Sequence, residues 1–234
     1  MPARTRPNPT VLFGASGLAV VAAVFLASQF PAVEGLGAKV RLPVFHGALT
    51  WANLVAFSLM ALGGVVFLAT KRADVYRLET GLRWVSIPVW LVGSGLGLWA
   101  ALGTWDLSGS SSSAMSVVLG DPRLMAQFWT LLLALLLLAL PLFVDDIRAL
   151  AAGDIAFTAL MWTLLLSAIL GPGRALHPDS PVLNSPEIGI KLLFFGIFGC
   201  LLLAVLLAAW GVSTFAKTPQ ETPSEDVAVE SARP

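Results

Sequence analysis

The chain contains only two histidines, His46 and His177, and each stands beside a long apolar stretch. Histidine is the commonest neutral metal ligand in proteins. His46 lies in the segment Leu42-Pro-Val-Phe-His-Gly-Ala-Leu-Thr-Trp51, and His177 is followed by Pro178 in a proline-rich segment. If both histidines face one compartment, their imidazoles could hold a single iron atom from opposite sides. The alternative is that each is an ordinary histidine at a water boundary.

Tryptophans, arginines and aspartates lie near the same boundaries. Indole rings could form a flat apolar platform for a porphyrin, and an arginine fork pairs well with a carboxylate such as a heme propionate. The alternative interpretation is an interfacial tryptophan belt, with arginines at helix ends and aspartates in solvent-facing turns. Besides the histidines, the residues considered for a heme site are Trp51, Trp99, Trp105, Asp106, Asp121 and Arg123, with Arg41 and Arg174 as further cations.

Membrane-spanning helices must position these residues. The 234-residue chain is 57% hydrophobic and 12% charged, whereas ordinary soluble domains carry about 25% charged residues. A spanning helix needs roughly 20 apolar residues, and backbone hydrogen bonding in hydrocarbon favours helices. We therefore predict an all-α polytopic membrane protein with six transmembrane helices. Charge-free stretches that can supply them lie between Arg6 and Glu34, Arg41 and Lys71, Arg83 and Asp106, Arg123 and Asp145, Asp154 and Arg174, and Lys191 and Lys217.

Lysine and arginine counts predict the orientation, because cytoplasmic loops carry an excess of them. Nine flank one side and five the other, with the clearest contribution from a loop expected over Lys71–Arg83. Both termini are therefore predicted to be cytoplasmic, with a cytoplasmic N-terminus over residues 1–9, the six-helix domain over 10–216 and a disordered tail over 217–234. The loops after the first, third and fifth spans then face the outside of a bacterial inner membrane. The first apolar core, from about Val11 to Ala27, is longer than that of a cleaved signal peptide, so a retained helix is expected.

Several classes of function are disfavoured by what the sequence lacks. The single cysteine, Cys200, excludes disulfides and thiol redox pairs. No phosphate-binding loop, paired catalytic carboxylates or HExxH motif is found, so we expect no enzyme activity, and no nucleic-acid partner is expected either. Charged residues are nearly absent from the expected spans, which argues against a proton or ion pump. The spacing of Gly93 and Gly97 predicts close helix packing.

Three short motifs follow one another along the chain. They are His46-Gly-Ala-Leu-Thr-Trp51, Gly95-Leu-Gly-Leu-Trp99 through Trp105-Asp106, and Asp121-Pro-Arg-Leu124. With six spans and two outward histidines, this order resembles the heme-handling C subunit of system I cytochrome c maturation, a family with a tryptophan-rich motif. The resemblance covers roughly residues 42–205 and is strongest from 46 to 128. A serine-rich insertion splits the motif, and Gly120 stands where the family has a tryptophan, which indicates a divergent member.

The resemblance implies that His46 and His177 are axial ligands of heme iron and that Trp99 and Trp105 line the platform. It also implies transfer of heme to a periplasmic chaperone, with ABC-type subunits of the maturation complex as further partners beside membrane lipid. Two other hypotheses stay open. One is a small-solute permease or the membrane subunit of an exporter, and the other is a purely structural membrane scaffold.

Overall fold

The computed structural model describes residues 8–34, 36–105, 113–171, 182 and 184–216. Over these residues the chain is all α, with six helices long and apolar enough to cross a membrane, as the sequence predicts. These helices are α1 (Pro9–Ser28), α2 (Arg41–Thr70), α3 (Ala73–Thr104), α5 (Pro122–Ala139), α6 (Ile147–Leu170) and α7 (Ile188–Ser213). Short elements join them: the 3₁₀ helices η1 (Ala38–Val40) and η2 (Leu140–Leu142), and the single-turn helix α4 (Ala114–Leu119).

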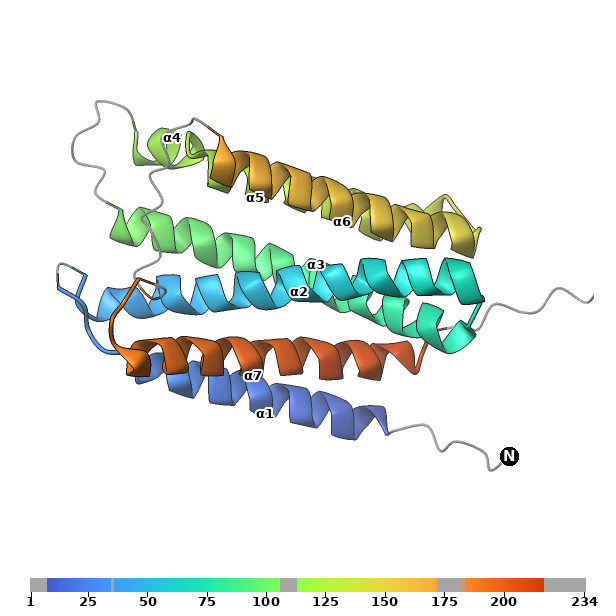
Figure 1. The fold of residues 1–234 in the computed structure, drawn as a ribbon, viewed down its shortest axis with the longest axis horizontal. Helices are drawn as coiled ribbons and strands as arrows, with labels where there is room; N and C mark the ends of the chain where they lie inside the picture. Colours follow the sequence, from blue (N-terminus) through green and yellow to red (C-terminus); the bar gives the residue numbers. More distant parts are fainter. Residues whose placement is uncertain (1–7, 35, 106–112, 172–181, 183, 217–234) are drawn as a thin grey trace, which may run out of the picture.

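The six long helices lie side by side in one bundle, and consecutive helices run in opposite directions (Figure 1). α1 and α7 pack together on one side, α5 and α6 pack together on the other, and α2 and α3 lie between the two pairs. In the most apolar 18-residue segments of the central helices α2 and α3, accordingly, 44% and 39% of the residues are buried, against 22% in α1, α5 and α6. The outer surface carries apolar side chains, among them Leu18, Leu136, Leu170 and Leu192, which suit contact with lipid tails.

The bundle has two distinct ends (Figure 1). We call one the His46 end; it holds the N-terminal ends of α2, α5 and α7 and the C-terminal ends of α1, α3 and α6. We call the other the Lys71 end; it holds the turn between α2 and α3, together with the start of α1 and the end of α7. The placement of the Lys71 end in the cytoplasm remains a prediction from the charge pattern, and the tail predicted over 217–234 lies outside the described residues.

Two helices extend well beyond the charge-free stretches used to predict them. α3 begins at Ala73 and α6 at Ile147, so Arg83 and Asp154 lie within helices. The prediction of a loop over Lys71–Arg83 is therefore wrong, because the connection between α2 and α3 consists of Lys71 and Arg72 alone. Since Arg83 is buried in an ion pair, the count that predicts the orientation falls from nine cations to eight, against five.

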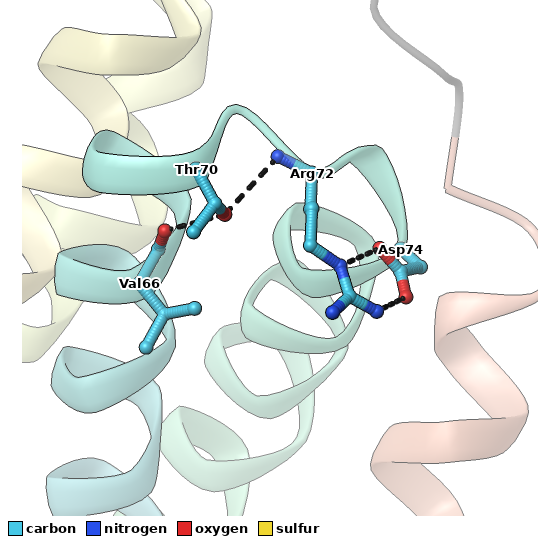
Figure 2. A network of polar contacts seen from close by, with 4 residues as sticks. All are labelled: Val66, Thr70, Arg72 and Asp74. Atoms are coloured by element: carbon cyan, nitrogen blue, oxygen red, sulfur yellow. Dashed lines mark hydrogen bonds and ion pairs between the residues drawn. The ribbon is translucent and has the colours of Figure 1, made fainter.

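Local contacts fix the turn between α2 and α3 (Figure 2). Lys71 adopts a left-handed conformation, with φ of 58°, that ends α2. The Thr70 hydroxyl donates to the Val66 carbonyl at 2.7 Å and accepts from the Arg72 amide at 3.4 Å. The Arg72 guanidinium then pairs with both oxygens of Asp74, at 3.2 and 2.6 Å. Asp74 stands in the first turn of α3, where a negative charge suits the helix dipole.

The core of the described residues has two large clusters of apolar side chains and a small one around Phe67 and Tyr76. In the middle of the bundle, Phe57 meets Trp90 and Phe157 edge to face, with ring centroids 5.8 and 5.0 Å apart, so aromatic packing joins α2, α3 and α6. Nearer the His46 end, Phe30 and Phe194 belong to a second cluster between α1, α2 and α7. These clusters hold α2 and α3 in register. The positions of His46 on α2 and of Arg83 on α3, described below, depend on that register.

Candidate functional site

His46 lies in the second turn of α2 and is anchored to α3. Its Nδ1 lies 3.0 Å from the carbonyl oxygen of Gly93. Because a carbonyl oxygen can only accept a hydrogen bond, Nδ1 must carry the proton and donate it. In the neutral ring the lone pair is then on Nε2, which is the arrangement found in metal-ligating histidines whose other nitrogen is held by a backbone carbonyl. The half-buried ring is thus oriented by the main chain of a neighbouring helix.

Gly97 gives the imidazole ring room against α3. A Cβ added at Gly97 would lie 2.5 Å from Cε1 of His46, 2.8 Å from Nε2 and 3.1 Å from Nδ1. Since these three distances are so similar, the Cβ would stand over the ring face rather than in its plane. The ring therefore lies flat on the α3 backbone, and any residue larger than glycine would displace it. The close packing that the glycine spacing predicts is present here, between a side chain of α2 and the main chain of α3.

The predicted tryptophan platform is distributed over several faces. Trp51 on α2 and Trp99 on α3 are both exposed, with 48% and 65% of their surfaces accessible. Trp99 follows Gly97 by two residues on α3, so its side chain is turned about 200° away from the face of α3 against which His46 packs. Trp105, at the C-cap of α3, is half-buried at the His46 end. Exposed positions for Trp51 and Trp99 also suit an interfacial belt, so their place in a heme platform stays a prediction.

The Asp-Pro-Arg-Leu motif starts α5. Asp121 is buried, and its Oδ1 accepts from the amides of Arg123 and Leu124 at 2.9 and 3.2 Å. An N-cap aspartate followed by proline at the first helical position is a strong helix-start signal. Arg41, another predicted cation, donates from Nε to the carbonyl of Phe30 at 3.1 Å, next to the C-terminal end of α1. Asp121 and Arg41 therefore stabilise helix ends at the His46 end.

Two predicted site residues, His177 and Asp106, lie outside the residues that the structure describes, as does Arg174. Within the described part of the chain, no group of three or more histidine, cysteine, aspartate or glutamate side chains could hold a metal ion. Of the predicted set, the structure thus brings His46 into a defined environment at α3 and places Trp105, Asp121 and Arg123 at the same end of the bundle.

A cluster of charged residues that was not predicted from the sequence is buried in the Lys71 half of the bundle. Arg83 on α3 donates from Nε and Nη2 to the two oxygens of Asp154 on α6, at 2.7 and 2.5 Å. Their side chains are 1% and 0% exposed. Glu79, one turn before Arg83 on the same face of α3, is also buried. The expectation that buried acids and bases are nearly absent from the spans is therefore wrong.

The sequence did carry a signal that Asp154 lies within a helix, although not that it pairs with Arg83. Asp146 caps α6 by accepting from the Arg148 amide at 2.8 Å, and a capping aspartate eight residues before Asp154 places Asp154 inside a helix. The prediction of spans from charge-free stretches did not reveal this position of Asp154, because it assumes that every charged side chain faces water. A guanidinium and a carboxylate that pair with each other can both be buried, and the assumption fails for them.

A groove lies beside the buried cluster, at the opposite end of the bundle from His46. It has a volume of about 610 Å³ and is formed by α2, α3 and α7. Its wall is mainly apolar, with Leu59, Leu62 and Trp210, and its polar lining includes Asp74, Arg77, Ser213 and Thr214. Gly63 of α2 also lines it.

Over the residues that the structure describes, fold and sites define a polytopic α-helical membrane protein with six candidate spans, an oriented histidine at one end and a buried ionic cluster toward the other. Comparison of the chain with protein-family models and with curated proteins finds no match.

Proposed function

We propose that this protein handles heme in cytochrome c biogenesis, binding heme at the His46 end and presenting it for transfer. The observation that carries the proposal is the orientation of His46, whose Nδ1 is held by the Gly93 carbonyl. That bond selects the tautomer with the lone pair on Nε2, so the donor fits a heme iron. The order of the three sequence motifs supports the same function.

In this proposal His46 and His177 ligate the iron, while Trp51, Trp99, Trp105, Asp106, Asp121 and Arg123 surround the porphyrin and its propionates. Bound heme supplies an iron centre that two neutral imidazoles stabilise. The residues of the chain bind and orient the group and carry out no covalent chemistry, so the protein acts as a carrier rather than an enzyme. Its site faces the periplasm from the inner membrane, where a heme chaperone receives the cargo and ABC-type subunits assemble with the carrier.

A hemin titration of the detergent-purified full chain tests the ligand assignment. We expect a Soret band on addition of hemin, a weaker band in His46→Ala and in His177→Ala, and none when both are replaced. If both single variants titrate like the unaltered protein, the histidines are not the ligands and the proposal fails.

Gly97→Ala tests the role of His46 without altering the histidine. The added Cβ would lie 2.5 Å from Cε1 of His46, so the ring must move and hemin affinity should fall. Gly95→Ala is the matched control on the same helix, because its Cβ would meet nothing within 4 Å. Equal hemin affinity in the two alanine variants would contradict the placement of His46 in the site.

A second candidate is a small-solute permease or the membrane subunit of an exporter. The buried cluster of Glu79, Arg83 and Asp154 favours it, because ionisable residues inside a helix bundle commonly mark ion or substrate pathways. Failure of the purified chain to bind hemin, together with solute uptake by reconstituted vesicles, would favour this function over heme handling.

A further inference from the structure

Glu79 of α3 packs against α2 beside α6 and is 1% exposed. A Cβ added at Gly63 would be 3.4 Å from Cβ of Glu79, and one added at Gly64 would be 3.1 Å from its Oε1. The Gly64 Cβ would also lie 3.1 Å from the carbonyl oxygen of Ala151 on α6. Two consecutive glycines of α2 thus make room for the Glu79 side chain, and an added methyl group at Gly64 would be in tight contact with its carboxyl oxygen.

Both carboxyl oxygens of Glu79 are buried and have no hydrogen-bond partner within the described part of the chain. Arg83 is the one buried cation among the described residues, and its Nε and Nη2 donate to Asp154. Native proteins rarely leave buried polar atoms without partners, and those they do leave call for an explanation in terms of function or of a bound species.

Few other groups face this cluster. Tyr76 lies one turn before Glu79 on α3 and is buried against Phe67 of α2. Asp154 comes from α6, and the adjoining segments of α2 (residues 60–70) and α7 (residues 205–213) contain no charged residue. Arg77 lines the neighbouring groove.

A count of charges then identifies what the cluster must bind. Two carboxyl groups and one guanidinium leave one negative charge in excess if both acids are ionised. An unpaired ion in a low-dielectric interior costs several kcal/mol, and in a membrane span it is a strong mark of function. A cation that removes this cost must fit beside Gly64, where an added Cβ would already lie 3.1 Å from Oε1 of Glu79 and 3.1 Å from the carbonyl oxygen of Ala151. A hydrated metal ion is too large for that space, and a proton is not.

We infer that Glu79 and Asp154 form a proton-binding site inside the bundle, holding one proton that exchanges through the groove at the Lys71 end. Gly63 belongs both to the wall of that groove and to the surface against which the Cβ of Glu79 packs, so the groove and the Glu79 side chain contact the same glycine. The inference does not rest on heme binding at the His46 end.

Infrared spectroscopy of the full chain in lipid vesicles tests the site directly, because a carboxylic acid and a carboxylate have different C=O stretching bands. We expect an acid band in the unaltered protein, its loss in Glu79→Gln, and its reversible decrease as the pH is raised. Glu187→Gln is the matched control, since Glu187 is an exposed glutamate at the start of α7, and it should keep the band. Labelling the unaltered protein with ¹³C-glutamate should shift the band, which assigns it to glutamate even if Glu79→Gln does not fold.

Three results would overturn the inference. The first is an acid band that persists unchanged in folded Glu79→Gln. The second is the absence of an isotope-shifted acid band in the unaltered protein at neutral pH, where exposed glutamates are ionised. The third is an acid band that does not respond to pH before the helices unfold, because a site that exchanges its proton with the groove must lose it as the pH rises.

Discussion

Removing both partners of the Arg83–Asp154 pair should cost less than the sum of the two single removals. Arg83→Met leaves two buried carboxyl groups and no cation. Breaking a buried pair in this way costs about 3–5 kcal/mol of unfolding free energy. Because both side chains are almost completely buried and the contact is bidentate, a value in that range is expected rather than the smaller cost of a surface pair.

Asp154→Asn should be less damaging than Arg83→Met. The amide oxygen can still accept one hydrogen bond from the guanidinium, and Glu79 lies one helical turn from Arg83 on the same helix, within reach as a substitute. We expect a cost of about 1.5–3 kcal/mol, the range for losing a hydrogen bond to a charged group. The two single variants thus separate the role of the cation from that of its present partner.

The double variant Arg83→Met/Asp154→Asn completes the cycle. It removes the unpaired cation as well as the unpaired carboxylate, so its cost should be smaller than the sum of the two single costs by about 2 kcal/mol or more. The measurement is reversible unfolding of the full chain in mixed micelles, followed by circular dichroism. Additive costs, within about 0.5 kcal/mol, would show that the two side chains do not interact and would refute the buried pair.

Two further predictions concern the close packing of α3 and the turn that precedes it. In Gly81→Ala the new Cβ would collide with the carbonyl oxygen of Ala209 on α7. Because backbone atoms cannot move aside cheaply, thermal unfolding should show that the free energy of unfolding falls by about 1–3 kcal/mol. The control Gly95→Ala, whose new Cβ has no atom within 4 Å, should be neutral or stabilising. Equal stability of these two variants would contradict the α3–α7 contact. Lys71→Gly should be more stable than Lys71→Ala by about 1 kcal/mol. Both variants lose the charge, but only glycine relieves the strain of the left-handed backbone at φ of 58°. A more stable alanine variant would argue against this turn conformation.

The helix ends show how far local sequence signals reach. Asp121 and Asp146 each stand where the first turn of a helix needs an acceptor, and both cap the helix that follows. The end of α2 was harder to predict, because Lys71 takes a conformation that usually favours glycine. There, contacts among Thr70, Arg72 and Asp74 define a turn that no single residue type announces.

The environment of His46 illustrates a second limit. The sequence identified His46 as a candidate ligand and Gly97 as a residue that permits close packing, but it gave no reason to connect them. Their contact depends on the register between α2 and α3. The same register turns Trp99 away from the face that holds His46, which the position of Trp99 near the predicted platform did not reveal.

Composition and the length of the apolar stretches were sufficient to predict six membrane helices, because the cost of placing backbone and charge in hydrocarbon acts on each segment separately. The burial of Glu79, Arg83 and Asp154 was decided only by tertiary structure. A charge is excluded from a membrane only while it is alone, and whether it has a partner depends on which face of α3 meets α6 across the bundle. That pairing joins residues 71 positions apart, and no local pattern in the chain encodes it.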